Sequence, residues 1–417
     1  MAMKIDVLGA GVVGVSTAWQ LAKDGHEVVV VDRGAEAANF TSYGNAGLVT
    51  PGHAYAWASP RAPGLMWRSL LAWDQAIVFR PRLDARQWRW TLAFLGQCTS
   101  ARARINTINK TRLCLYSQGV LGEVVAETGV AYDRGTGGIL YFYRTAASFD
   151  GAAAKADLLR SQGVEIVALD RAAAIARDPG LAAAAGQIAG ALYVPTDESG
   201  DCHKFTQGLA AACAARGVTF RWNTPVTGLD VENGEIARAR TDAGPITADA
   251  YVVCLGVYAP HLLDRLGIHL PIYPVKGYHL TIPATDSSAL PRIGGVDEDN
   301  LLAYCPMGDR LRITATAEIA GYSTTHKPGD FAIMTERAKR LFPKGLDYAK
   351  LTRWAGLRPM TPTGMPVIDR SPYANLWLNT GHGHIGWTMA SGSARVLADL
   401  VGQRQPAIAR EGMRYEG

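Results

Sequence analysis

The residues with the clearest chemical meaning lie in a glycine-rich turn near the start of the sequence. The turn Gly9-Ala10-Gly11-Val12-Val13-Gly14 follows an apolar strand pattern and precedes a helical one, and Asp32 ends the next apolar run. This G-x-G-x-x-G spacing suits a dinucleotide, because its glycines permit a tight turn, close approach of a pyrophosphate and close helix packing. We expect the helix N-terminus to hold the phosphates and Asp32 to accept hydrogen bonds from ribose hydroxyls.

A second turn of this kind lies near the other end of the sequence. A strand pattern over 376–379 leads into Gly381-His382-Gly383-His384-Ile385-Gly386-Trp387-Thr388-Met389, where another helix begins. Two helix N-termini in one domain could hold two anionic centres, a pyrophosphate and the N1–C2=O edge of a reduced isoalloxazine. The first turn alone fits NAD or FAD, but nicotinamide has no second anion, so the pair of turns favours a flavin.

The elements that must position these turns indicate an α/β fold with a β-rich insertion. Residues 4–32 have the pattern of a βαβ unit in a parallel sheet, whereas 272–316 has strand patterns joined by polar turns. Helical patterns run over 113–127 and, with one interruption, over the alanine-rich stretch 151–187. We predict a Rossmann-like FAD-binding domain over 1–87, 196–267 and 351–417, with an inserted, mainly antiparallel β domain for substrate over 88–195 and 268–350.

Composition excludes several other classes of protein. The 417 residues are 48% hydrophobic with a net charge of +5, which is too apolar for a disordered chain. No apolar run reaches the roughly 18 residues of a membrane-spanning helix, and no leader pattern precedes the first strand, so we expect a cytoplasmic protein. The six cysteines lack a C-x-x-C pair, and His382 and His384 offer only two ligands, so no metal is expected.

Six segments carry a resemblance to a known family along essentially the whole chain. They are VLGAGVVGVSTAWQLAKDGHEVVVVDR at 7–33, TSYGNAGLVTPG at 41–52, TDESGDCHKFTQGLA at 196–210, YPVKGYHLTIP at 273–283, GLRPMTPTGMPVI at 356–368 and LNTGHGHIGWTMASG at 378–392. The chain resembles the small subunit of bacterial D-amino acid dehydrogenase, in the D-amino acid oxidase/glycine oxidase superfamily. The resemblance implies noncovalent FAD and oxidation of D-amino acids to imino acids, which water hydrolyses to 2-oxo acids and ammonia. It also implies that electrons pass to a quinone or another carrier instead of oxygen.

The resemblance assigns roles to individual residues. Arg358 matches the arginine that pairs with the substrate carboxylate, and a planar guanidinium is well suited to that task. Val226 matches the residue that holds adenine, and Gly256 matches a glycine beside the cofactor. The turn 381–389 matches the cradle of the flavin N1–C2=O edge. The remaining cofactor contacts that we expect are Arg33, Thr41, Ser42, Asn45, Ala46, Gly47 and Leu48.

The sequence departs from the family pattern at His53 and His384. Both histidines could face the substrate, and we take His53, Tyr278 and Tyr304 as candidate catalytic residues, with Tyr55 as a further pocket candidate. Each of these side chains fits a hydrogen-bonded core position equally well. Flavin chemistry requires little from side chains, and no residue of the sequence has to act as a general base.

One stretch, 57–112, is strongly basic and rich in tryptophan. It holds ten arginines and lysines against two aspartates, and five of the ten tryptophans. Met66, Leu70, Trp73 and Ile77 recur at helical spacing. A core helix with a solvated basic face and an interfacial helix on anionic lipid both fit, and nucleic-acid binding has no supporting motif. We expect contact with an anionic membrane surface through 65–95, on the cytoplasmic face of the inner membrane.

Other functions fit the same residues. The chain could act on another small amine, such as glycine, sarcosine or a hydroxy-D-proline. It could also be a redox subunit that works only inside a hetero-oligomer, or a nucleotide-binding module without catalysis. The oligomeric state is left open by the sequence.

Overall fold

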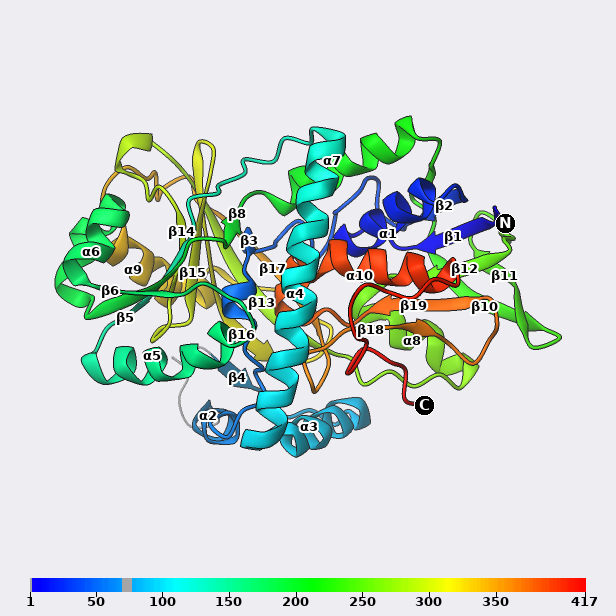
Figure 1. Cartoon of the computed structure of the whole chain (residues 1–417), viewed down its shortest axis with the longest axis horizontal. Helices are drawn as coiled ribbons and strands as arrows, with labels where there is room; N and C mark the ends of the chain where they lie inside the picture. The colour runs from blue at the N-terminus through cyan, green and yellow to red at the C-terminus, as the bar shows by residue number, and fades with distance from the viewer. Residues whose placement is uncertain (1, 70–76) are drawn as a thin grey trace.

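Two sheets, each covered by helices, make up the computed structural model, which describes residues 2–69 and 77–417 (Figure 1). Within those residues, one sheet has six strands in the order β18-β19-β12-β1-β2-β9. All neighbours are parallel except the edge strand β18, which runs antiparallel to β19. Its strands are β1 (Lys4–Leu8), β2 (Glu27–Val31), β9 (Thr219–Arg221), β12 (Ala250–Val253), β18 (Val367–Arg370) and β19 (Leu376–Thr380).

The second sheet contains nine strands of the described chain and is mainly antiparallel. Its order is β17-β13-β16-β15-β14-β5-β7-β6, with β4 paired in parallel to β16. Its strands are β4 (Ile77–Phe79), β5 (Ile139–Tyr143), β6 (Val167–Asp170), β7 (Gly190–Val194), β13 (Tyr273–Pro283), β14 (Gly294–Asp297), β15 (Leu302–Met307), β16 (Arg310–Ile319) and β17 (Thr352–Met360). Two small pairs complete the strands, β3 (Leu48–Val49) with β8 (Glu198–Ser199) and β10 (Val226–Glu232) with β11 (Glu235–Thr241).

Helices flank both sheets. Their bounds are α1 (Val12–Lys23), α2 (Ala62–Ser69), α3 (Ala85–Gln97), α4 (Ser100–Thr128), α5 (Ala146–Arg160), α6 (Arg171–Arg177), α7 (Cys202–Ala215), α8 (Ala259–Leu263), α9 (Ala332–Leu341) and α10 (Gly386–Val401). Short 3-10 turns cover Pro51–His53, Pro179–Gln187, Gly256–Tyr258, Asp264–Leu266, Ser287–Ala289, Pro328–Phe331 and Gly383–Ile385. Figure 1 shows α4 running from top to bottom across the middle of the molecule, between the large sheet on the left and the parallel sheet on the right, with α1 and α10 beside it.

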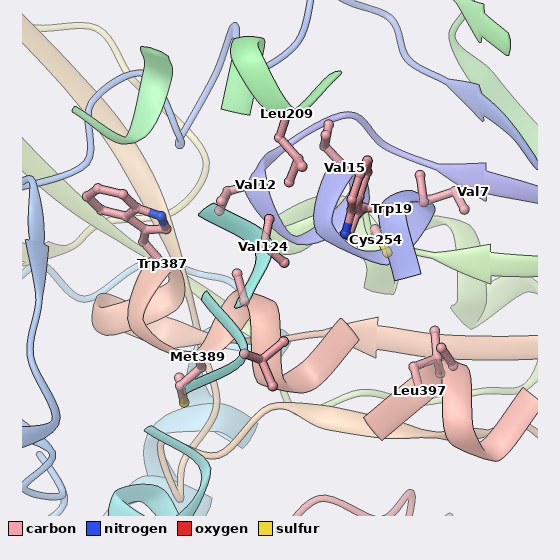
Figure 2. Packing of buried hydrophobic residues seen from close by; sticks show 14 of the residues in the cluster. Val7, Val12, Val15, Trp19, Val124, Leu209, Cys254, Trp387, Met389 and Leu397 are labelled. Carbon is pink, nitrogen blue, oxygen red and sulfur yellow. The ribbon is translucent and has the colours of Figure 1, made fainter. Parts of the chain in front are cut away.

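The core between the parallel sheet and its helices joins distant parts of the chain. Figure 2 shows Val15 and Trp19 of α1, Leu209 of α7, Val124 of α4 and Leu397 of α10 packed into one apolar cluster. All of these side chains are buried, and burying each one fully contributes roughly 1.5–3 kcal/mol. This packing brings the N-terminal turn and the start of α10 to one side of the same sheet.

The structure corrects two local predictions. The apolar stripe at 66–77 is not one continuous helix, because its last residue, Ile77, lies in β4, which pairs with β16. Two residues of that stripe, Leu70 and Trp73, lie outside the described residues. The stretch 151–187 is not helical throughout, because β6 extends the large sheet at 167–170. The predicted division into two domains stays a prediction. Strands β4 and β17 come from the ranges 1–87 and 351–417, which were assigned to the FAD-binding domain, yet both strands pair within the large sheet.

Candidate active site

A cavity of about 920 Å³ reaches from the parallel sheet to the large sheet. Residues 9–13 and Asp32 line it on the side of the parallel sheet, and the turn 381–387 lines it further along. Strands β13, β16 and β17 line it on the side of the large sheet. The two glycine-rich turns, separated by more than 360 residues in the sequence, therefore open into one space.

The N-terminal turn has the close packing that its glycines predict. Gly9 has a positive φ of 110°, in the region that favours glycine. A Cβ on Gly14 would lie 1.8 Å from the carbonyl oxygen of Gly9, so Gly14 does not line the cavity but lets α1 approach β1. The Val12 N–H donates to Ser42 Oγ at 3.0 Å. Asp32 accepts from the N–H groups of Ala10 and Gly34, both at 2.6 Å, which fixes its carboxylate at the end of β2.

Aromatic rings and an arginine form the wall beside Asp32. The Arg33 guanidinium carbon lies 4.3 Å from the ring centroid of Phe40 and 4.2 Å from that of Tyr258. Val226 begins β10 and lines the same part of the cavity, as does Gly256, whose φ is 53°. Flat apolar surface of this kind is suited to an adenine ring, and adenine contact by Val226 and cofactor contact by Arg33 and Gly256 stay predictions.

The C-terminal turn presents backbone groups to the cavity at the start of α10. The 3-10 turn Gly383–Ile385 runs directly into α10, and neither element has a side-chain cap. Two residues that we expected here do not line the cavity. Thr388 accepts a hydrogen bond from the Thr50 N–H at 3.0 Å, and Met389 is fully buried in the core. The helical turn carries both side chains away from the cavity, which leaves 381–387 as the lining segment.

The loop before β3 forms another wall. Its predicted residues Thr41, Ser42, Asn45, Ala46 and Leu48 all line the cavity. Gly47 does not, although its conformation supports the loop. Its φ is 81°, and a Cβ there would lie 2.7 Å from Sγ of Cys305. Gly47 also donates its N–H to the Asn45 side chain at 2.8 Å, so it shapes the loop without facing the cavity.

Arg358 is a half-buried cation on the large sheet that lines the cavity. Its Nη1 donates to the carbonyl oxygens of Thr316, at 3.2 Å, and Lys276, at 3.5 Å. Within residues 2–69 and 77–417, Arg358 makes no ion pair with a carboxylate. Burial lowers the pKa of Arg358 from 12.5 to about 10, so the group stays charged at neutral pH. A ligand carboxylate would compensate this charge.

Two backbone features that the sequence analysis missed hold Arg358 in place. A Cβ on Gly277 would lie 2.5 Å from the guanidinium carbon, so only glycine lets Arg358 lie across β13. Thr316 has a φ of 63°, which is strained for a β-branched residue, and it lies at a bulge between β13 and β16. The bulge turns the Thr316 carbonyl toward Arg358. A bulge of this kind gives no signal in the local sequence pattern.

His53 lies on another wall as part of a polar cluster. Its Nε2 is 2.8 Å from Glu298 Oε1, and its ring stacks on Tyr141 with centroids 5.3 Å apart. Burial opposes a charge on His53, but the Glu298 carboxylate outweighs it and raises the pKa of His53 above its ordinary value. Behind them, the Tyr141 hydroxyl donates to Asp197 at 2.5 Å, and burial raises the pKa of Asp197 to about 7.

His384 faces the cavity and is held from behind by a buried lysine. Its ring stacks on Trp57 with centroids 4.4 Å apart, and its Nε2 is 3.4 Å from Lys110 Nζ. Burial, followed by the charge of Lys110, holds the pKa of His384 well below its usual range, so the ring is neutral. His382 instead contacts Ser393 Oγ at 2.8 Å. Among the described residues no group of three or more His, Cys, Asp or Glu side chains could hold a metal ion.

The two tyrosine candidates occupy different places. Tyr278 lines the cavity, but its hydroxyl donates to Glu318, so the phenol is anchored within the sheet. Tyr304 does not line the cavity. It is fully buried against Phe342, with ring centroids 5.0 Å apart, because the register of β15 points it into the core of the large sheet. Tyr304 is therefore a core residue and is dropped from the candidate site, while Tyr55 does line the cavity.

The cavity has the features that FAD requires. Two helix N-termini, those of α1 and α10, open toward it without a side-chain cap from their own N-cap residues, and each suits one anionic part of the cofactor. The wall of Arg33, Phe40 and Tyr258 suits the adenine end, and the turn 381–387 suits the flavin end. When bound, FAD supplies the ability to take up a hydride at N5 of its ring.

Comparisons with known proteins agree with this geometry. The model of the family described as "DAO: FAD dependent oxidoreductase" matches residues 4–400. A protein of Mesorhizobium japonicum named "D-amino acid dehydrogenase 2" is 48% identical and covers 100% of both chains. One of Paramagnetospirillum magneticum named "D-amino acid dehydrogenase" is 44% identical, covering 99% of this chain and 98% of its own. The relatives match over their full length and are not named as subunits, so the expected resemblance to a small subunit is not supported.

Solved structures show the same fold. Glycine oxidase from Geobacillus kaustophilus has a TM-score of 0.76 at 22% identity, covering 99% of this chain and 98% of its own. L-proline dehydrogenase from P. horikoshii has a TM-score of 0.73 at 18% identity, and the match covers 96% of this chain and 94% of that chain. These neighbours, with the family model, confirm the predicted fold class, a Rossmann-like FAD-binding fold joined to a mainly antiparallel β part. The chain belongs to the DAO family of FAD-dependent oxidoreductases, and FAD is its cofactor.

Proposed function

We propose that this chain is an FAD-dependent D-amino acid dehydrogenase, which converts D-amino acids to 2-oxo acids and ammonia. The observation that carries the proposal is the half-buried guanidinium of Arg358, which faces the cavity without a carboxylate partner in the described residues. A substrate with a carboxylate fits this charge. The full-length relatives named D-amino acid dehydrogenase support the choice of substrate.

The chain's own residues would bind and orient the amino acid. Arg358 would hold the carboxylate in a bidentate pair, with the Thr316 and Lys276 carbonyls fixing the guanidinium. The apolar walls would disfavour the charged ammonium, so the amine would lose its proton before the Cα–H bond breaks. Neutral His384, beside the flavin end, would add a polar contact without adding charge. Loss of hydride from Cα and of a proton from nitrogen gives the imine, which water hydrolyses.

A panel of amines tests this function. The purified holoenzyme is mixed with D-amino acids, their L-enantiomers, glycine, sarcosine and hydroxy-D-proline, with a soluble dye or oxygen as acceptor. We expect dye reduction with D-amino acids, equal amounts of ammonia and 2-oxo acid, and little peroxide. Turnover of glycine or sarcosine with stoichiometric peroxide would contradict the proposal. Activity that requires an added protein would favour a redox subunit.

We infer that electrons pass to a quinone or another carrier, and that residues 65–95 contact anionic lipid. The support is that α2, α3 and the start of α4 carry exposed arginines and exposed large apolar side chains. Such a surface suits headgroups of anionic lipid and the acyl boundary beneath them. No helix in the described part of the chain is long and apolar enough to cross a membrane.

Vesicle binding tests the membrane contact. The triple variant Arg68→Glu, Arg82→Glu, Arg89→Glu, which changes three exposed arginines of 65–95, should bind anionic vesicles at least about tenfold more weakly, since each basic residue near the surface contributes about 1 kcal/mol. The matched control changes three exposed lysines near α9, Lys339, Lys344 and Lys350, to glutamate and makes the same change in net charge. Equal loss of binding in both triple variants would mean that only net charge matters, and would contradict the assignment to 65–95.

A further inference from the structure

Lys110, in the first half of α4, is a buried cation that the proposed function does not use. Its side chain is fully buried, and its Nζ donates to the Tyr55 carbonyl at 3.1 Å and lies 3.4 Å from Nε2 of His384. It makes no ion pair with a carboxylate in the part of the chain that the structure describes. Burial lowers the pKa of Lys110 to about 8, so the ammonium is mostly charged at neutral pH. A buried charge without a counter-charge costs stability, and an anionic oxygen of a ligand would compensate it.

The contact with Lys110 decides which ring nitrogen of His384 carries the proton. The His384 ring is neutral, because burial holds its pKa well below the usual range. An ammonium group can only donate hydrogen bonds, so Nε2 of His384 must accept, and the single ring proton then lies on Nδ1. His384 therefore carries an Nδ1–H donor, and its acceptor nitrogen is occupied by Lys110.

Other contacts hold the His384 ring in place and leave Nδ1 available. The ring stacks on Trp57 with centroids 4.4 Å apart and planes 26° from parallel. Both rings line the cavity, whereas Lys110 does not. Nδ1 of His384 forms no hydrogen bond with residues 2–69 and 77–417. The helix that carries Lys110 is itself tied to α10, because the Ser117 hydroxyl accepts from the Gly392 N–H at 2.9 Å.

The surroundings of His384 are electropositive. Beyond burial, which is the largest cause, the charges of Lys110, His53 and Arg358 each lower the pKa of His384. The ligand group that such a potential favours is an oxygen atom with negative charge. The proposed reaction has two groups of this kind, the substrate carboxylate, which Arg358 would hold, and the N1–C2=O edge of the cofactor, which the turn 381–387 suits.

We propose that Lys110 is a positioning residue, which holds His384 in the tautomer that donates its Nδ1–H to an anionic oxygen of the bound cofactor or substrate. The proposal rests on the proposed function, which brings both oxygens to this cavity. Lys110 acts through His384, since it does not line the cavity itself. The cofactor edge and the substrate carboxylate would accept from the same donor, and separate measurements distinguish them.

NMR of the FAD-loaded protein with nitrogen-15 in its histidine rings measures the tautomer at neutral pH. The signals of His384 are identified by their absence in His384→Asn. We expect a protonated Nδ1 and an unprotonated Nε2 in the unmodified protein. Lys110→Met removes the donor and keeps an unbranched side chain, so both tautomers should be populated. The matched control Arg104→Met removes the same charge from an exposed position on α4 and should leave the tautomer unchanged.

Two further measurements identify the oxygen. If it belongs to the cofactor edge, Lys110→Met should bind reduced FAD, relative to oxidised FAD, at least tenfold more weakly, which lowers the two-electron reduction potential by about 30 mV or more. If it belongs to the substrate carboxylate, the potential should stay the same and the KM for D-alanine should rise at least tenfold. The KM for the amine that lacks the carboxylate should then not rise. Arg104→Met should change neither the potential nor KM.

A protonated Nε2 of His384 in the unmodified protein would overturn the proposal, whether or not Lys110→Met folds and keeps FAD. An unchanged tautomer in Lys110→Met would also overturn it, as would a changed tautomer with the potential and KM both unaltered. Absence of any turnover of D-amino acids by the unmodified protein would instead refute the proposed function, because the tautomer and the potential are measured without substrate.

Discussion

Replacing Arg358 by alanine should remove most catalysis of carboxylate substrates while leaving the protein folded and loaded with FAD. The guanidinium would give a carboxylate two charge-assisted hydrogen bonds, each contributing roughly 1.5–3 kcal/mol. Loss of both costs roughly 3–6 kcal/mol, and since 1.36 kcal/mol is a tenfold change, kcat/KM should fall by roughly 10² to 10⁴. Folding should not suffer, because the substitution removes a half-buried charge that has no carboxylate partner among the described residues.

The assay compares two substrates and two control variants. Dye-linked kcat/KM is measured for a D-amino acid and for the primary amine that lacks only its carboxylate. Arg358→Ala should lower kcat/KM only for the D-amino acid. Arg358→Lys should recover part of that kcat/KM, because lysine keeps the positive charge but cannot form the bidentate pair of a guanidinium with a carboxylate. Arg353→Ala, an exposed arginine on the same strand β17, should behave like the unmodified protein. An equal loss for both substrates, or normal turnover in Arg358→Ala, would refute the carboxylate role.

Three further predictions concern the polar groups around the cavity. Asp197 has a pKa of about 7 in the folded protein, so it keeps a proton there that the unfolded chain loses above about pH 4, and the stability of the fold should fall as pH rises between these values. Thermal melts of Asp197→Asn should no longer show this fall. A fall that persists in the variant would contradict the assignment to Asp197. Because Glu298 raises the pKa of His53, the ion pair stabilises the fold fully below pH 6.5, and this stabilisation is lost as pH rises through the pKa of His53 in the folded protein. The difference in free energy of unfolding between the unmodified protein and Glu298→Gln should therefore shrink as pH rises above 6.5. A difference that does not change with pH would contradict the His53–Glu298 pair. Thr316→Gly should keep the affinity for substrate, because the backbone carbonyl of residue 316, and not its side chain, accepts the hydrogen bond from Arg358. The free energy of unfolding should change by no more than about 1 kcal/mol. A tenfold loss of substrate affinity would show that the Thr316 side chain is needed.

The sequence predicted those parts of the site that depend on local pattern. The turn at 9–14, Asp32 and the turn at 381–387 could be found because glycine spacing, strand periodicity and helix starts are properties of neighbouring residues. The family resemblance placed Thr388 and Met389 in the cradle, because a match between sequence segments does not show how one helical turn rotates these side chains away. The fold class followed from the same patterns together with the family resemblance.

What the sequence could not predict depends on contacts between distant segments. The Thr316 bulge arises from the register of β13 against β16, and the contact between Lys110 and His384 joins residues 274 positions apart. Tyr304 was misplaced for a similar reason, since an alternating strand pattern does not tell which face meets the cavity and which meets Phe342. Gly277, which leaves room for the Arg358 guanidinium, is recognisable only once the strands are paired.

Mixing the FAD-loaded protein anaerobically with D-alanine tests most directly whether the cavity joins a flavin to a carboxylate anchor. We predict that the yellow absorbance of the oxidised cofactor is lost rapidly with D-alanine and not with L-alanine. In Arg358→Ala, which should retain the yellow colour, the same loss should be slower by two orders of magnitude or more. Equally fast bleaching in both proteins, or no bleaching by any D-amino acid in the unmodified one, would contradict the account.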